Sequence, residues 1–258
     1  MNIHKYILRF ANSLVNLIVI MIVFIVGSYC AYCLWDNQQI FVEAENVQED
    51  MIKLKPEIVE EEGEAKISFE ELLVINPDVC AWLTLDGTKI DYPVLQGENN
   101  LEYINKDVYG DFALAGSIYL DSRCDKEYRS KYSLLYGHYM AQRRMFGDLE
   151  LYKDETFFDE NNTGVLILPD RVYDLEIFCC MLVSENDDYI FTPDNWEYSI
   201  DDLLSYAEQN AMHLHKDILK NAREQKDTQI LSMTTCSYEY EDARTIVLAV
   251  MKPHDTTN

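Results

Sequence analysis

Basic residues are scarce in this chain of 258 residues, where 21 lysines and arginines stand against 46 aspartates and glutamates, giving a formal net charge of −25. An acidic surface of that size repels phosphate backbones, which argues against nucleic acid as a partner. The sequence also has no glycine-rich phosphate loop, no internal repeat and no low-complexity block. Hydrophobic residues make up 48% of the chain, so a real core can form and wholesale disorder is excluded.

Charged residues are absent from Phe10 to Trp35, an apolar run that exceeds the roughly 20 residues needed to cross a bilayer. A cleaved signal peptide is the alternative, but its apolar region usually has about 7–15 residues, and no clear cleavage site ends this run. We therefore expect an uncleaved, single-pass transmembrane anchor at residues 10–35. Lys5 and Arg9 precede it and acidic residues follow it, so the positive-inside rule places residues 1–9 in the cytoplasm and the remaining bulk outside.

Residues 36–66 contain ten acidic residues and only three lysines. This composition predicts an extended, solvated stalk that separates the membrane from a globular domain at residues 67–258. A short helix is expected near Ile67 to Ile75, where Ser68 and Glu71 have the spacing of a capping box.

Eight segments after the stalk are rich in β-branched and aromatic residues, which is typical of strands. They are residues 79–85, 88–96, 116–120, 131–139, 164–168, 172–183, 229–235 and 245–251. About eight short strands favour a mainly β fold with a closed barrel over an α/β sheet. Two helices are expected between them, one from about Phe146 to Glu160 and one from about Ser199 to Arg223, with Ser199 and Asp202 at the N-terminal cap of the second.

Three chemically informative residues lie at the ends of these strands. His138 ends one strand, Cys236 ends a later one, and Arg244 opens the next strand. A neighbouring imidazole or cation promotes the deprotonation that makes a thiol nucleophilic. A guanidinium supplies the donors that an oxyanion requires. Taken singly each residue is a weak signal, since an isolated histidine or cysteine is more often a packing residue than a catalyst.

The same residues resemble the active-site motifs of sortases. Tyr136-Gly137-His138, Thr234-Thr235-Cys236 and Arg244 stand in the order of that family's His, Thr-Cys and Arg elements. Ser232-Met233 replaces the more typical Thr-Leu ahead of the Thr-Cys pair, which itself is intact. Four further segments, and the long insertion before the cysteine strand, are similar to class B sortases over roughly residues 68–252. The segments are Asn76–Trp82, Gly87–Gly97, Asn99–Tyr103 and Gly116–Asp121.

The resemblance implies a membrane-anchored cysteine transpeptidase of Gram-positive surfaces, with an eight-stranded barrel and a catalytic domain at residues 67–258. Such enzymes cut a sorting motif near the C-terminus of a secreted protein and hold the acyl fragment as a thioester. They then transfer the fragment to an amine of a cell-wall precursor or a pilin subunit. Carried over to this sequence, Cys236 is the nucleophile, His138 the acid and base, and Arg244 the stabiliser of the oxyanion or bound peptide. The positions that match the substrate groove are Asn100, Tyr136 and Thr234.

Neither a cofactor nor a metal is implied, because His213 and His215 lie on an expected polar helix with no third ligand nearby in the sequence. Two alternatives stay open beside the transpeptidase. A hydrolytic cell-wall cysteine peptidase would use the same groups, although papain-like peptidases place the cysteine before the histidine in the chain. A catalytically idle surface binding module would keep the barrel as a scaffold, although the three chemical residues are all retained here.

Overall fold

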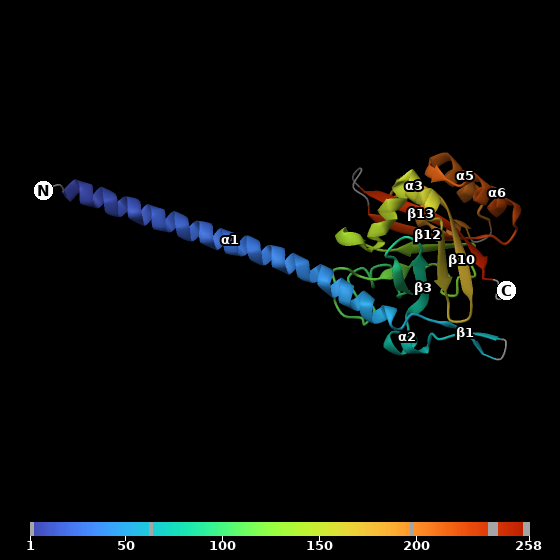
Figure 1. Cartoon of the computed structure of the whole chain (residues 1–258). Coiled ribbons are helices and arrows are strands. Elements are labelled where there is room, and N and C mark those ends of the chain that lie inside the picture. The colour runs from blue at the N-terminus through green and yellow to red at the C-terminus, as the bar shows by residue number, and fades with distance from the viewer. Residues whose placement is uncertain (1–2, 62–63, 197–198, 237–241, 255–258) are drawn as a thin grey trace. The chain divides into compact units, whose positions relative to one another are not determined.

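The computed structural model describes residues 3–61, 64–196, 199–236 and 242–254 (Figure 1). The chain divides into two compact units, residues 1–43 and residues 44–258. Helix α1 (Ile3–Ile52) forms the first unit and continues into the second. Among the described helices, α1 alone is long and apolar enough to cross a membrane. Its composition agrees with the anchor expected at residues 10–35, while the side of the membrane on which each end lies stays a prediction.

The segment predicted as a stalk is partly folded. Residues 36–52 are helical, so the extended conformation predicted for this part of residues 36–66 is wrong. Ala44, Gln48 and Met51 are buried in the second unit. These three positions recur at the spacing of one helix face, a pattern that a count of charges over the segment overlooks. After α1, strands β1 (Ile58–Glu61) and β2 (Glu64–Ile67) pair with each other.

The core of the second unit is a closed barrel of eight strands, as the sequence predicts. Around the barrel the order is β10, β13, β12, β6, β5, β4, β3 and β9, and β9 pairs back onto β10 to close it. The bounds are β3 (Val79–Leu85), β4 (Asp91–Leu95), β5 (Ile118–Leu120), β6 (Tyr132–Tyr136), β9 (Thr163–Ile167), β10 (Val172–Ser184), β12 (Gln229–Cys236) and β13 (Ala243–Pro253). Closure leaves no free sheet edge within the ring.

Two pairs in the ring, β4–β5 and β6–β12, are parallel, and the others are antiparallel. Side chains from all around the ring meet in a large hydrophobic cluster, including Leu83, Leu134 and Val247, which are fully buried. In the β6–β12 pair, the motif residues Tyr136 and Thr234 lie opposite each other near the ends of their strands.

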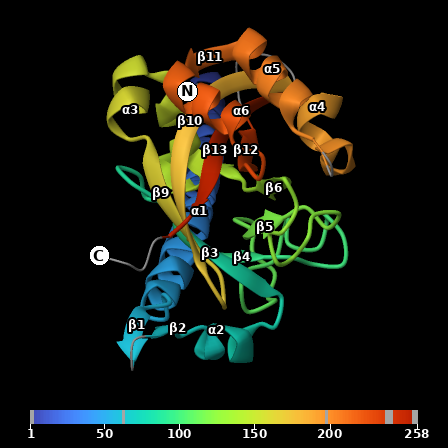
Figure 2. The ribbon, with the colours of Figure 1, turned by 90° about the vertical axis from the view of Figure 1, so that its right-hand side faces the viewer.

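Short elements connect the strands. They are α2 (Glu70–Ile75), β7 (Tyr139–Met140), η1 (Ala141–Arg143), β8 (Arg144–Met145), η2 (Phe146–Lys153), α3 (Glu155–Glu160), α4 (Asp188–Phe191), η3 (Pro193–Trp196), α5 (Asp201–Asn210), β11 (Ala211–Leu214) and α6 (Lys216–Glu224). Figures 1 and 2 place α5 and α6 beside β10, at the end of the barrel opposite α2. The predicted helix from Phe146 to Glu160 is a 3-10 helix, η2, followed by α3, which Asp154 caps through the Phe157 amide.

The predicted helix from Ser199 to Arg223 is interrupted, which corrects the sequence-based expectation. Strand β11 separates α5 from α6 and pairs with β10 at Cys179 and Cys180, outside the ring of eight. An available strand edge thus overrides helical periodicity in this segment. His213 therefore lies on a strand, and His215 precedes α6.

Both predicted helix caps are also wrong. Ile200 is the N-cap of α5 and Phe69 that of α2, and neither helix has a capping hydrogen bond from the N-cap side chain. The Ser199 hydroxyl accepts instead from the amide of Asp201, in a local turn before α5.

Candidate active site

The ends of β6 and β12 bring the histidine and cysteine positions together. In the parallel register Tyr136 lies opposite Thr234, and the Gly137 amide donates to the Thr234 carbonyl over 3.2 Å. His138 follows Tyr136 by two residues, and Cys236 follows Thr234 by two. Because parallel strands advance in the same direction, the equal steps carry both residues to one end of the barrel.

The neighbouring strand brings the arginine to the same place. In the antiparallel β12–β13 pair, Cys236 lies directly opposite Arg244. The backbone of Cys236 is described as the last residue of β12, whereas its side chain and residues 237–241 lie outside the described part of the chain. Of the two predicted partners of the thiol, His138 thus follows β6 and Arg244 lies on β13, the strands on either side of β12.

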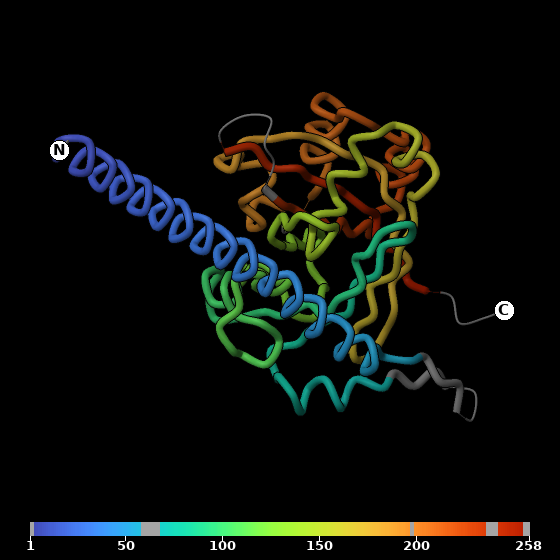
Figure 3. The backbone as a smooth tube through the Cα atoms, turned by 60° about the vertical axis from the view of Figure 1, so that its left-hand side comes forward, coloured from blue at the N-terminus to red at the C-terminus, as the bar shows by residue number. Residues whose placement is uncertain are grey.

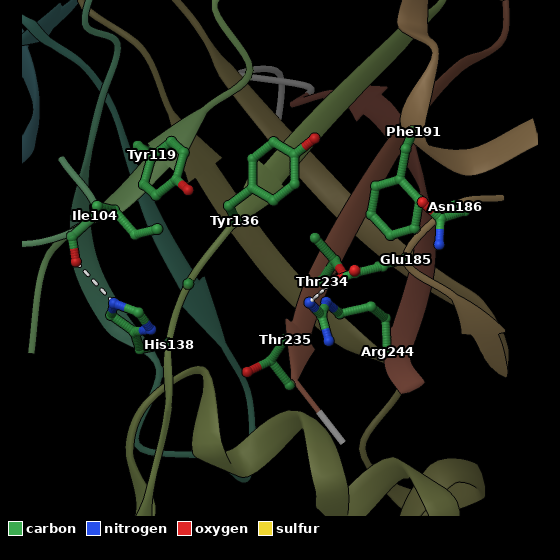
Figure 4. A pocket seen from close by; sticks show the side chains of 11 residues that line it. Ile104, Tyr119, Tyr136, His138, Glu185, Asn186, Phe191, Thr234, Thr235 and Arg244 are labelled. Atoms are coloured by element: carbon green, nitrogen blue, oxygen red, sulfur yellow. Dashed lines mark hydrogen bonds and ion pairs between the residues drawn. The ribbon is translucent and has the colours of Figure 1, made fainter. Parts of the chain in front are cut away.

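A pocket of about 320 Å³ opens where these strand ends meet. His138 lines one side and Arg244 the other, and Thr234 and Thr235 lie between them (Figure 4). Among the described residues, neither threonine hydroxyl has a hydrogen-bond partner, although both are buried. Buried polar atoms usually do have partners, so these two hydroxyls are exceptions in the floor of the pocket.

The imidazole of His138 is fixed by one hydrogen bond. Its Nε2 atom lies 2.7 Å from the carbonyl oxygen of Ile104. A carbonyl oxygen only accepts, so Nε2 carries the hydrogen in this arrangement. The Nδ1 atom lies on the side of the ring away from Ile104 (Figure 4).

The guanidinium of Arg244 is held along one edge. Its Nη2 atom makes an ion pair with Glu185, and its Nη1 atom donates to the carbonyl of Ala243 over 3.0 Å. Glu185 is itself tied down, because its amide donates to the Asp242 carbonyl over 2.9 Å. Three-quarters of the Arg244 side chain is shielded from solvent, which strengthens its electrostatic effect on a group in the pocket.

Three aromatic rings form another wall of the pocket. Tyr119 and Tyr136 stack with ring centroids 5.3 Å apart, and Phe191 continues the row at 6.3 Å from Tyr136. The Tyr136 hydroxyl donates to Asp121 over 3.0 Å. Burial, followed by the charge of Asp121, raises the pKa of Tyr136, so its hydroxyl stays protonated as a donor.

Asp121 anchors this wall from behind. Its carboxylate is fully buried and accepts hydrogen bonds from Arg123 and from the Asn100 side chain, the latter over 2.8 Å. Arg123 also donates to the carbonyl of Phe191 over 2.8 Å. Burial alone would raise the pKa of Asp121, but the hydrogen bonds from Arg123 and Tyr136 outweigh it and hold that pKa below its ordinary value. One carboxylate therefore fixes both Tyr136 and Phe191.

Two of the three residues predicted to bind substrate line the pocket, and the third is not among its described lining residues. Tyr136 and Thr234 line the pocket. Asn100 is not among the described residues that line the pocket. Its side-chain amide donates to Asp121, and its side-chain oxygen accepts from the Ser122 backbone amide over 2.7 Å. A direct contact of Asn100 with substrate stays a prediction.

Sequence reasoning missed Glu185, Phe191, Ile104 and Tyr119, which also line the pocket. Glu185 and Phe191 follow β10, while Ile104 lies between β4 and β5. Tyr119 lies in one of the resembling segments, but nothing in that motif marks a ring in the pocket. Barrel closure, rather than local spacing, brings these side chains beside the motif residues.

Comparison with known proteins identifies the family. No family model matches the chain. Sortase B of Listeria monocytogenes is 30% identical over 187 residues, covering 72% of this chain and 74% of the relative. Sortase B of Staphylococcus aureus is 24% identical over 240 residues, covering 93% and 95%. A solved Streptococcus pyogenes class B sortase involved in pilus biogenesis aligns with a TM-score of 0.65 and 35% identity, over 71% of this chain and 97% of that structure.

The closed barrel and these similarities define the class of protein as a sortase, a family of cysteine transpeptidases. Within it, this chain belongs to the class B sortases.

Proposed function

We propose that this chain is a membrane-anchored cysteine transpeptidase that cleaves a C-terminal sorting motif of secreted proteins and transfers the acyl fragment to an amine. In this proposal residues 10–35 cross the membrane, residues 1–9 lie in the cytoplasm, and the catalytic barrel faces the outside of a Gram-positive cell. The apolar length of α1 and the basic residues that precede residues 10–35 support this topology.

One observation carries the proposal for the active site. The β6–β12 and β12–β13 registers bring the positions of His138, Cys236 and Arg244 to one end of the barrel. His138 and Arg244 also line the same pocket. A nucleophile, an acid–base group and an oxyanion donor around one cavity are the set that acyl transfer requires.

The first half-reaction cleaves the sorting motif. The Cys236 thiolate adds to the scissile carbonyl, and the negative charge that develops on the carbonyl oxygen is stabilised by donors of Arg244. As the carbon–nitrogen bond breaks, the protonated His138 gives its proton to the departing amine. The N-terminal part of the substrate is left as a thioester on Cys236.

The second half-reaction transfers the acyl group. An incoming amine attacks the thioester carbonyl, and His138 takes up the proton that this amine loses. The thiolate departs, and an amide bond replaces the thioester. The acceptor in this proposal is a cell-wall precursor or a pilin subunit. The similarity to the Streptococcus pyogenes class B sortase involved in pilus biogenesis supports the second acceptor class.

The test is a covalent trapping experiment. Wild-type enzyme incubated with a cleavable sorting peptide and no amine should gain the mass of the N-terminal fragment at Cys236. Adding an amine should then discharge this adduct into a new amide product. The Cys236→Ala variant should form neither adduct nor product, and Cys80→Ala, which changes a buried thiol in the barrel core, is the matched control. Turnover in Cys236→Ala, or an adduct on another cysteine, would contradict the proposal. If water releases the acyl fragment from Cys236 and an amine does not, the chain is a peptidase.

A further inference from the structure

The chain after His138 forms a small hairpin that is folded back on itself. Strands β7 and β8 pair Tyr139 with Met145, and the Phe146 amide donates to the His138 carbonyl over 3.1 Å. Residues 138–146 are called the histidine hairpin below. The segment begins at the proposed catalytic histidine, and its last residue is hydrogen-bonded back to that histidine. Any shift of this hairpin moves the backbone of His138.

The histidine hairpin is strained. Gln142, Arg143 and Met145 have φ angles of 62°, 62° and 50°, in the left-handed region that non-glycine residues rarely adopt. Such conformations persist only where the surrounding structure over-determines them, and they gather at functional sites. The contacts that hold this hairpin therefore control the position of His138.

One set of contacts that hold the hairpin comes from helix α1. Arg144, at the tip of β8, makes an ion pair with Glu45, and its Nη1 atom donates to the Gln48 side chain over 3.3 Å. Only 13% of the Arg144 side chain is exposed, against 46% of Glu45, so the arginine end of this pair is shielded from solvent. Figure 3 shows the yellow-green chain of this region beside the last turns of α1.

A second set of contacts links the same helix to the turn of the hairpin. The Gln48 side chain donates to the Lys89 carbonyl over 3.0 Å, and the Lys89 amide donates to the buried carboxylate of Asp148 over 2.7 Å. Asp148 in turn accepts two hydrogen bonds from Arg143, at 2.7 and 2.9 Å. Arg144 is therefore tied directly to Glu45 and Gln48. The strained Arg143 is connected to Gln48 through Asp148 and Lys89.

We propose that the last turns of α1, residues Ala44–Ile52, position the catalytic histidine by clamping the histidine hairpin through Arg144. Glu45, Gln48 and Arg144 are positioning residues in this view, since they act on the reaction through His138. The segment that continues from the membrane-spanning part of the chain would thus complete the active site. This inference rests on the proposed function, in which His138 moves the protons.

The test uses the full chain in detergent micelles and substitutions that remove one charge each. Glu45→Gln and Arg144→Gln should speed amide hydrogen exchange within residues 138–146 and lower kcat by roughly 10-fold, inside the range of about 10²-fold that a 1 Å misplacement of a catalytic group can cost. The KM for peptide should stay within about twofold, because the aromatic wall of the pocket is untouched. Glu49→Gln, an exposed change of the same charge on the same helix, is the matched control and should behave as wild type.

A charge exchange separates clamping from a general loss of stability. Arg144→Glu should lose activity, and the double variant Glu45→Arg with Arg144→Glu should recover part of the lost kcat. Three results would overturn the inference. They are unchanged amide hydrogen exchange and kcat in Glu45→Gln, no recovery of kcat in the double variant, or an equal loss of kcat in Glu49→Gln. If the wild-type enzyme transfers no acyl group, the proposed function fails. The rate of amide hydrogen exchange in residues 138–146 still decides whether α1 clamps the hairpin.

Discussion

The two sides of the active site are held by different kinds of structure. Cys236 and Arg244 lie opposite each other on long neighbouring strands, where a continuous ladder of backbone hydrogen bonds sets their register. His138 lies where β6 has ended, at the start of a hairpin with three left-handed residues. The first side is fixed by backbone hydrogen bonds, which do not depend on the identity of the side chains. The second depends on the backbone carbonyl of Ile104 and on particular side chains from Asp148 and helix α1.

The comparison predicts that the histidine side is both chemically essential and the easier one to disturb. Substitutions on β13 should remove a chemical group and leave its neighbours in place. Substitutions around the histidine hairpin should act at a distance. The following three experiments test this contrast, from the largest expected effect to the smallest.

His138→Ala should cause the largest loss. In the proposed mechanism it removes the proton donor for the departing amine, and general acid–base catalysis is typically worth about 10²–10⁴-fold in rate. Measuring kcat/KM with a fluorogenic sorting peptide checks this. His254→Ala, which removes a ring bonded to Asp174 on the surface, is the control and should keep full activity. A loss of less than tenfold in His138→Ala would show that another group carries the proton.

Arg244→Lys should cost somewhat less, about 10²–10³-fold, the usual effect of removing one oxyanion donor. Lysine keeps the charge but lacks the planar fork that holds Glu185 while facing the pocket. Because Arg244 lies within a regular ladder, the melting temperature should not change, and hydrogen exchange in residues 138–146 should stay as in wild type. Arg129→Lys on the exposed surface is the control. Faster exchange in the hairpin would contradict the independence of the two sides.

Asp121→Asn should have the smallest effect, and mainly on stability. The buried carboxylate accepts charge-assisted bonds from Arg123, so its loss should cost about 1.5–3 kcal/mol at neutral pH. The pKa of Asp121 is lowered in the folded protein, so its contribution is present above the unfolded value of about 3.9 and lost as pH falls through the folded value. Denaturant titrations from pH 7 to pH 3 should show wild type and variant converging at the acid end.

The control for this titration is Asp188→Asn, an exposed aspartate in the same region. It should unfold as wild type does at every pH. A gap between wild type and Asp121→Asn that stays constant down to pH 3 would mean that the charge of Asp121 does not stabilise the fold.

Much of the barrel follows from local sequence. The segment predicted at residues 79–85 has the bounds of β3, and the other seven predicted strands all appear, shifted by a few residues. These strands are rich in side chains that fit a pleated surface, so composition and turn residues are enough to locate them. The helix predicted from Ser199 to Arg223 failed at Ala211–Leu214 because those residues pair with β10, a partner far away in the chain.

The sequence by itself determined the eight strands, the apolar helix and the three motif residues, because each is written in short-range patterns of residue type and order. Only the tertiary structure decided that Glu185 holds Arg244, that Asp121 supports the aromatic wall, and that residues 45–48 reach Arg144. The Glu45–Arg144 pair joins residues 99 positions apart. Contacts of that separation are fixed by strand register and barrel closure, which no local pattern in the chain records.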